Sequence, residues 1–196
     1  MAETGRRALT KARNRDTILA AARQVFAELG YDAASVRDII RRTHLASGTF
    51  YNYFRSKEEI ARALEADAAE RLGPILRAER ERAADLPAWL DGVLRAYFRF
   101  LVQDYGGRAA GLPPTRLGAS PALRAVFEEV RLSLTQRLGG RLSPGAEADY
   151  LTAAAIGIAR HVGGQMLRRD PPDPDGAAAF ATRLILHGLP GVAGGE

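Results

Sequence analysis

The sequence predicts an all-α protein of about nine helices, in which an N-terminal three-helix domain precedes a C-terminal helical bundle. Three observations support this fold class. Apolar residues recur at helical spacing along most of the chain, residues that cap helices precede several of these stretches, and no stretch alternates like a half-buried strand. At 196 residues the chain is long enough to bury the core of one or two domains.

The first helix is predicted from about Lys11 to Leu29, with Gly30 as its C-cap. Its apolar face consists of Ile18, Ala22, Val25, Phe26 and Leu29. A basic leader, residues 1–9, precedes it and is expected to be disordered. Such a leader is either a solvated tail or an arm that contacts phosphates or a minor groove.

Two short helices joined by a tight turn are predicted next. Ser35 and Asp38 have the spacing of a shortened capping box at the start of the first. His44 occupies the position where the turn requires a left-handed backbone, a conformation that glycine adopts more readily. Ser47 is predicted to cap the second short helix, residues 48–54.

The second short helix carries small polar and aromatic residues where a core helix would carry leucines. Phe50 and Phe54 are four residues apart and are expected to face inward together. The other sides are left to Thr49, Tyr51, Asn52 and Tyr53. This pattern is typical of a helix-turn-helix whose recognition helix enters the major groove of DNA.

A capping box formed by Ser56 and Glu59 predicts the start of the following helix. Lys57 is then the first helical residue, where the helix dipole disfavours a cation. An external anion such as a DNA phosphate would account for a lysine there. The alternative is an ordinary solvated lysine.

Charge is distributed unevenly along the chain. Residues 1–63 contain 12 Lys and Arg against 7 Asp and Glu, whereas residues 64–196 contain 16 of each, so the net charge of +5 lies in the N-terminal third. A basic first domain favours a nucleic-acid partner. The chain has no cysteine, no apolar N-terminal signal and no apolar run that could span a membrane. We therefore expect a cytoplasmic protein with no membrane partner.

The segment from about Thr10 to Leu64 resembles the DNA-binding domain of the tetracycline-repressor (TetR) family of bacterial transcription regulators. The matching pieces are ILAAARQVFAELGYDAASVRDI and SGTFYNYFRSKEEI. The chain departs from the family pattern at His44 and Ala46, where the family has glycine and serine. The departure at Ala46 moves the expected cap to Ser47.

The resemblance implies a set of DNA contacts. Ser35 and Arg37 would touch the DNA backbone and a base edge, four residues of the recognition helix would enter the groove, and Tyr53 and Lys57 would hold phosphates. Asn52 fits helix packing and DNA contact equally well. The complete candidate set is Ser35, Arg37, Ser47, Gly48, Thr49, Tyr51, Asn52, Tyr53 and Lys57.

The rest of the chain, residues 56–196, reads as helices that follow a DNA-binding domain of residues 10–55. The helix from Ser56 should kink or break at Gly73-Pro74. Residues 105–119 read as a loop, and further helices are predicted over residues 86–103, 121–138, 144–169 and 175–189. The first of these is apolar on every side and is expected to be central.

Small residues line the predicted helix of residues 144–169, including Ala153, Gly157 and Gly164. Such a surface lets another helix approach closely. The family resemblance implies that the last two long helices form a two-fold dimer, and two recognition helices a turn or more of DNA apart need such symmetry. The alternative is packing within one chain.

The resemblance also implies a cavity for a small-molecule effector in the C-terminal domain. Candidate lining residues are Trp89, Val93, Tyr97, Phe100, Phe127 and Met166, with Arg131 and His161 as candidates for a polar end of the ligand. Alternatively, each of these residues simply fills the core, and His161 is a half-buried helix residue.

No enzyme motif is present, and the three histidines have no metal-ligand spacing, so we expect neither catalysis nor a cofactor or metal. The predicted function is a DNA-binding transcriptional regulator, a repressor released from a palindromic operator by a lipophilic or aromatic ligand. Two alternatives remain, an architectural DNA-binding protein without a ligand and a helical small-molecule carrier with a vestigial DNA-binding domain.

Overall fold

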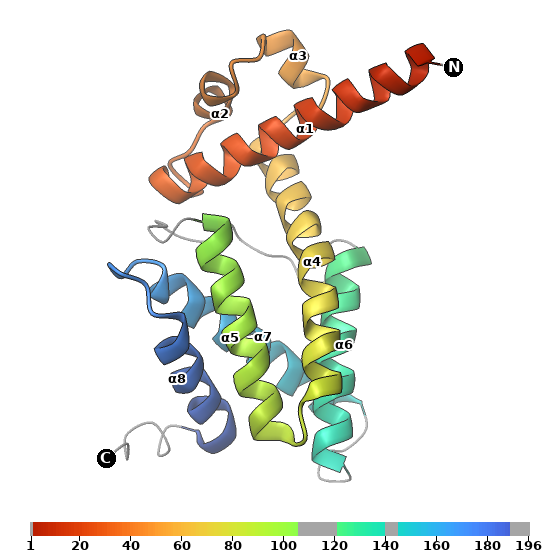
Figure 1. Cartoon of the computed structure of the whole chain (residues 1–196). Helices are drawn as coiled ribbons and strands as arrows, with labels where there is room; N and C mark the ends of the chain where they lie inside the picture. The colour runs from red at the N-terminus through yellow and green to blue at the C-terminus, as the bar shows by residue number, and fades with distance from the viewer. Residues whose placement is uncertain (1, 106–120, 140–144, 189–196) are drawn as a thin grey trace.

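The computed structural model describes residues 2–105, 121–139 and 145–188, and in these ranges it contains eight α-helices and no strand (Figure 1). This confirms the all-α fold class. The helices are α1 (Ala2–Leu29), α2 (Val36–Thr43), α3 (Ser47–Tyr51), α4 (Lys57–Arg82), α5 (Leu86–Tyr105), α6 (Pro121–Leu138), α7 (Ala146–Met166) and α8 (Pro174–His187). The predicted loop of residues 105–119 lies almost wholly outside the described residues.

Helix α4 is one continuous helix, so of the kink or break predicted at Gly73-Pro74 the break does not occur. Pro74 removes one backbone donor, but Leu72 and Leu76 on either side are both buried. Packing of these neighbours holds the helix together through the proline. The uninterrupted α4 is one reason why the described residues contain eight helices instead of about nine.

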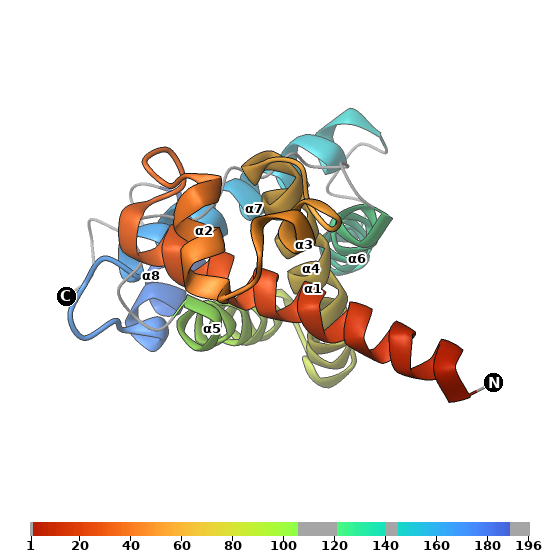
Figure 2. The ribbon, with the colours of Figure 1, turned by 90° about the horizontal axis from the view of Figure 1, so that it is seen from above.

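Helix α1 begins at Ala2, nine residues before the predicted start at Lys11. The expected disordered leader is therefore helical in the structure. Its alanines, arginines and leucine favour a helix, and the Thr10 hydroxyl donates a 3.0 Å hydrogen bond to the carbonyl of Arg6 one turn back. The N-terminal half of α1 projects past α3 (Figure 2).

The N-terminal domain has its own apolar core, built by α1, α2, α3 and the first two turns of α4. The core residues are Ile18, Leu19, Ala21, Ala22, Val25, Phe26, Ala34, Ile39, Phe50, Phe54, Ile60, Ala61 and Leu64. Three of them, Ile60, Ala61 and Leu64, lie beyond the predicted domain boundary at residue 55. The DNA-binding fold thus includes the start of α4.

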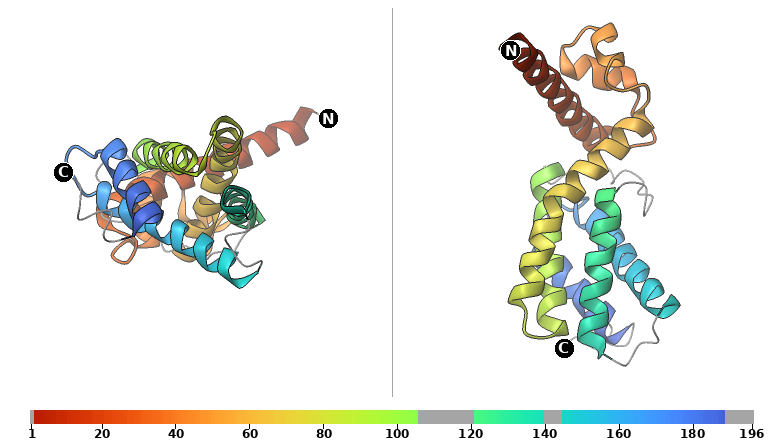
Figure 3. Two further views of the ribbon diagram at one scale, coloured as in Figure 1. Left: turned by 90° about the horizontal axis from the view of Figure 1, so that it is seen from below. Right: turned by 90° about the vertical axis from the view of Figure 1, so that its right-hand side faces the viewer.

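A second core fills the C-terminal bundle, to which α4 also contributes Leu72 and Leu76. As predicted from its all-round apolar sequence, α5 is central and packs against α1, α4, α6, α7 and α8. At Gly163 of α7 an added Cβ would come within 2.6 Å of the Leu101 Cδ1 atom of α5, so this glycine sets how closely α7 approaches. Helix α4 runs between the two domains and bends along its length (Figure 3, right).

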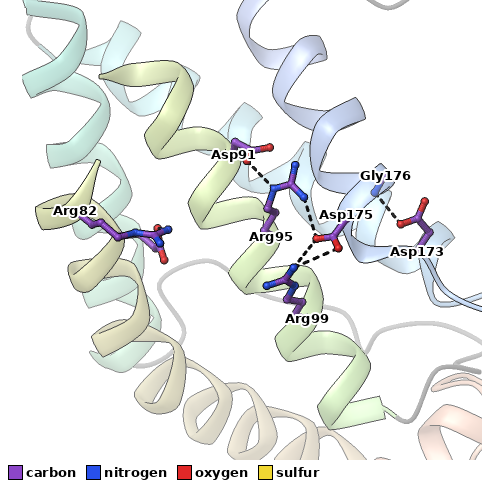
Figure 4. A network of polar contacts seen from close by, with 8 residues as sticks. Arg82, Asp91, Arg95, Arg99, Asp173, Asp175 and Gly176 are labelled. Atoms are coloured by element: carbon purple, nitrogen blue, oxygen red, sulfur yellow. Dashed lines mark hydrogen bonds and ion pairs between the residues drawn. The ribbon is translucent and has the colours of Figure 1, made fainter. Parts of the chain in front are cut away.

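Ion pairs on the surface join α5 to α8. Arg95 and Arg99 contact the Asp175 carboxylate at 3.0 and 2.9 Å (Figure 4). Asp175 was predicted to open the last helix, but the N-cap is Asp173, whose carboxylate accepts a 2.8 Å hydrogen bond from the backbone N–H of Gly176. Pro174 is then the first helical residue, where its missing N–H costs nothing. None of the helices in the described ranges is long and apolar enough to cross a membrane.

Candidate functional site

The turn between α2 and α3 has the backbone geometry that the sequence predicts. The capping box of α2 is complete, because the Ser35 Oγ accepts from the Asp38 N–H at 3.3 Å and the Asp38 Oδ2 accepts from the Ser35 backbone N–H at 3.0 Å. The Ser35 Oγ also donates to the Asp38 Oδ2 at 2.5 Å. These hydrogen bonds from Ser35 lower the pKa of the Asp38 carboxyl. His44 ends α2 in the left-handed region with φ of 57°, the conformation for which glycine is usual.

Helix α3 begins one residue earlier than predicted. Its N-cap is Ala46, which has no side-chain oxygen to cap the helix, and Ser47 is the first helical residue. The helix spans Ser47–Tyr51 instead of extending to Phe54. Phe50 and Phe54 are buried in the N-terminal core as predicted, and they anchor α3 to the domain.

Most of the predicted DNA-contacting residues are exposed. Arg37, Ser47, Gly48 and Asn52 are exposed, and Tyr51 is 52% exposed although it is aromatic. At Gly48 an added Cβ would meet nothing within 4 Å, so the backbone there is open to a surface. Helices α2 and α3 lie together at the end of the molecule remote from the C-terminal bundle (Figure 1).

Tyr53 is half-buried against α1, where its hydroxyl accepts a 3.3 Å hydrogen bond from the Asn14 Nδ2. This hydrogen bond shows Tyr53 packing against α1, which is the alternative to the phosphate contact implied by the family resemblance. Thr49 is half-buried, and Asn52 is the C-cap of α3. The recognition helix is thereby fixed to α1 at its C-terminal end.

Lys57 has a different role in the structure from the one predicted. Its Nζ donates hydrogen bonds to the carbonyls of Tyr31, Asp32 and Ala34 at 2.9, 3.0 and 3.2 Å. It also lies 4.7 Å from the centre of the Tyr31 ring. An ammonium has three donors, and all three are used to tie the start of α4 to the α1–α2 loop. These internal hydrogen bonds account for a lysine at this helix start without an external anion, and the phosphate contact of Lys57 stays a prediction.

A cavity of about 150 Å³ lies between α4, α5, α6 and α7 in the C-terminal bundle. Four of the predicted ligand-binding residues line it, namely Val93, Tyr97, Phe100 and Phe127. Its other apolar walls include Leu72, Leu76, Leu123, Val126, Val130 and Ile156. The cavity is therefore mainly lined by aliphatic and aromatic side chains.

Four other predicted ligand residues do not line this cavity. Trp89 is buried in the core with the Arg137 guanidinium 5.4 Å from its ring centre, and Met166 is buried at the end of α7. Arg131 pairs with Glu128 at 2.7 Å, and His161 is exposed. Helical spacing placed these residues in the right helices but could not determine which face of each helix borders the cavity.

Polar groups missed by the sequence analysis also line the cavity. They are Glu65 of α4, Tyr105 of α5 and Arg160 of α7. Burial raises the pKa of the Tyr97 and Tyr105 hydroxyls above the usual range, so both phenols stay protonated and able to donate. A charged residue at one point on a long helix carries no sequence signal for a cavity, which is why Glu65 and Arg160 went unnoticed. Among the described residues, no group of His, Asp and Glu could hold a metal ion.

A cluster of four charged residues joins both domains beside the cavity. Arg23 of α1 contacts Asp67 of α4 and lies 3.3 Å from Asp104 of α5. Arg71 contacts the same two aspartates at 3.1 and 2.8 Å. Its guanidinium also lies 4.7 Å from the ring centre of Phe100, a cavity wall.

Comparison with known proteins identifies the N-terminal domain directly. Residues 18–64 match the family model described as bacterial regulatory proteins, tetR family. The chain is 28% identical over 184 residues to the uncharacterized HTH-type transcriptional regulator YdgC of Bacillus subtilis, a match that covers 90% of this chain and 92% of that protein. The similarity therefore extends well beyond the matched domain.

Solved structures share the whole fold. The fatty acid degradation regulator FadR from Bacillus halodurans superposes with a TM-score of 0.69 at 23% identity, covering 90% of this chain and 96% of that one. FadR from Bacillus subtilis, solved in complex with stearoyl-CoA, gives 0.67 at 21% identity, covering 88% and 98%. Together with the exposed recognition helix, these findings show a DNA-binding transcriptional regulator whose residues 18–64 form a DNA-binding domain of the tetR family of bacterial regulatory proteins.

Proposed function

We propose that this regulator binds a palindromic operator as a homodimer, represses transcription there, and is released by a small lipophilic or aromatic molecule. The observation that carries the proposal is the position of α4. Its first turns belong to the DNA-binding core through Ile60 and Leu64, and its later turns line the cavity through Leu72 and Leu76. A ligand that moves α4 therefore acts on both domains.

The cavity wall favours an apolar ligand with one polar group. Phe100, Phe127 and Val130 supply apolar surface, whereas Tyr97 and Tyr105 supply hydroxyl donors. Glu65 and Arg160 add a carboxyl group and a guanidinium at the same cavity. Such a lining suits a ligand that carries a hydroxyl or carbonyl on an aromatic or aliphatic body.

The charged cluster at the domain junction offers a route from ligand to DNA. Phe100 lines the cavity, and its ring lies under the Arg71 guanidinium. Arg71 forms an ion pair with Asp104, and Asp104 also contacts Arg23 of α1. We propose that a ligand against Phe100 and Tyr105 shifts the end of α5 and so changes the angle of α1. The ligand needs differential affinity for the two arrangements to do this.

The alternatives fit these observations less well. An architectural protein without a ligand needs no cavity beside α4. A carrier with a vestigial DNA-binding domain needs neither an exposed Arg37 and Tyr51 nor an excess of positive charge in the first 63 residues. We propose that this regulator acts in the cytoplasm, because the bacterial chromosome lies there. We propose no catalytic activity for it.

The test fills the cavity without changing charge. Ala68 lines the cavity on α4, whereas Ala78 of the same helix is exposed and does not line it. The fluorescent aromatic amine N-phenyl-1-naphthylamine serves as a lipophilic probe, and a duplex selected from a random library by the full chain serves as operator. We expect the probe to bind wild type and Ala78→Phe and to weaken the operator binding of both. Ala68→Phe should still bind the operator, but the probe should not change that binding. Equal probe binding by Ala68→Phe would place the ligand elsewhere.

A further inference from the structure

A polar cleft of about 490 Å³ separates the N-terminal turns of α1 from α3. One wall is formed by Arg6, Arg7, Thr10 and Lys11 of α1, and the other by Thr49, Asn52 and Tyr53. Among the residues whose side chains the structure describes, this lining contains three cationic residues and no carboxylate. A cleft with this charge beside a recognition helix suits the phosphate backbone of DNA.

The direction of the α1 arm is fixed by contacts with the DNA-binding domain. Asn14 donates to the Tyr53 hydroxyl, and the Arg15 guanidinium lies 5.9 Å from the ring centre of Phe54. On the N-terminal side of Asn14, α1 remains helical to Ala2. The arm is therefore a rigid extension whose base is anchored at the end of the recognition helix.

The arm places its cations well outside the helix-turn-helix. Arg6 precedes Asn14 by two turns, so at 1.5 Å per residue it lies about 12 Å further along the helix axis. Arg6, Arg7, Lys11 and Arg13 are all exposed. Seen from the side, the arm ends near the level of α3, at the end remote from the bundle (Figure 1). Seen from above, it extends past α3 (Figure 2).

We propose that the N-terminal turns of α1 form a second DNA contact, in which Arg6 and Lys11 hold backbone phosphates beside the groove that α3 enters. The inference rests on DNA binding through α2 and α3. It adds a sequence-independent grip to their sequence-dependent readout. The helical form matters, because a rigid arm holds its cations over the phosphates without paying the ordering cost of a flexible tail.

The first test removes charge. Arg6→Gln with Lys11→Gln should lower affinity by about 10- to 50-fold at physiological salt, and should reduce the slope of log affinity against log salt by about two. Both effects should appear on the selected operator and on an unrelated duplex. Arg77→Gln with Arg82→Gln is the matched control, since these exposed arginines lie on the C-terminal half of α4. The control should keep the wild-type slope.

The second test keeps the charge and removes the helix. Thr10→Pro breaks the helix on its N-terminal side, because the proline ring clashes with the preceding turn. The rest of α1 tolerates this proline as its first residue. We expect Thr10→Pro to lose the share of the salt slope that Arg6 supplies, about one of the two lost by the double variant, because Lys11 stays in the helix that remains. The unfolding midpoint should be unchanged. A flexible basic tail would retain the slope in Thr10→Pro.

The outcomes separate this inference from the function on which it rests. Arg37→Ala should lose preference for the operator but keep the salt slope. The arm variants should have a smaller salt slope but keep the preference for the operator. In hydroxyl-radical footprinting they should lose protection of the DNA backbone only next to the groove that α3 enters. A wild-type slope and footprint in the Arg6 and Lys11 double variant would overturn the inference while leaving operator binding intact.

Discussion

Arg71 of α4 donates a 2.8 Å hydrogen bond to Asp104 of α5, and this pair stands between the cavity and the DNA-binding domain. The Asp104 side chain is only 9% exposed and also contacts Arg23 of α1. A mostly buried carboxylate shared by two arginines from different helices is sensitive to small shifts of any partner. The domain junction is therefore held by charge as well as by apolar packing.

This relationship predicts energetic coupling between α1 and α5. Asp104→Asn should lower the free energy of unfolding by about 1–3 kcal/mol, because two partly buried guanidiniums lose a charged acceptor. In a double-mutant cycle, Arg23→Met and Asp104→Asn should be coupled by more than about 0.5 kcal/mol. Chemical denaturation measures the cycle, with Asp91→Asn as a control inside the C-terminal domain. Strict additivity would show that the contact carries no coupling.

Lys57 is predicted to matter for stability and not for salt dependence. Lys57→Met keeps much of the side-chain bulk but removes three hydrogen bonds to the α1–α2 loop, so we expect a loss of about 1–3 kcal/mol in unfolding free energy. At temperatures where the variant is folded, its salt slope on DNA should match wild type. Arg55→Met, which changes a neighbouring exposed cation, is the stability control. A stable Lys57→Met with a reduced slope would instead restore the phosphate role.

Gly157 tests the proposed dimer. An added Cβ at Gly157 would meet nothing within 4 Å in the single chain, in contrast to Gly163, which packs against α5. Gly157→Arg should therefore leave the fold of one chain intact but break a close contact between two copies. Gly157→Ala should remain dimeric and be about 0.5–1 kcal/mol more stable, because alanine favours a helix over glycine. Light scattering measures the molar mass of both variants in solution. A monomeric wild type at micromolar concentration would contradict the proposed dimer.

Local signals in the sequence predicted local structure well. The Ser35 capping box, the left-handed His44 and the central α5 all follow from residue types at fixed spacing. Features that depend on tertiary packing were missed. Nothing local indicates that buried neighbours carry α4 through Pro74, or that Lys57 reaches carbonyls more than twenty residues away.

The cavity illustrates the same limit. The apolar residues on every side of α5 indicated that this helix would line the cavity, and Tyr97 and Phe100 do so. Trp89 and Met166 share the same chemistry but face other parts of the core. Which face borders empty space depends on how the helices cross, and a single sequence does not encode that in any short pattern.

The central claim is that α2 and α3 read operator DNA, and Arg37 tests it most directly. Arg37 is exposed at the start of α2, and an arginine can pair bidentately with guanine. The measurement is the affinity of wild type and Arg37→Ala for the selected duplex and for an unrelated duplex at one salt concentration, with Arg77→Ala as control. We predict a loss of about 1–3 kcal/mol in binding free energy on the selected duplex, with a much smaller loss on the unrelated one. Wild-type affinity of Arg37→Ala for the selected duplex would contradict it.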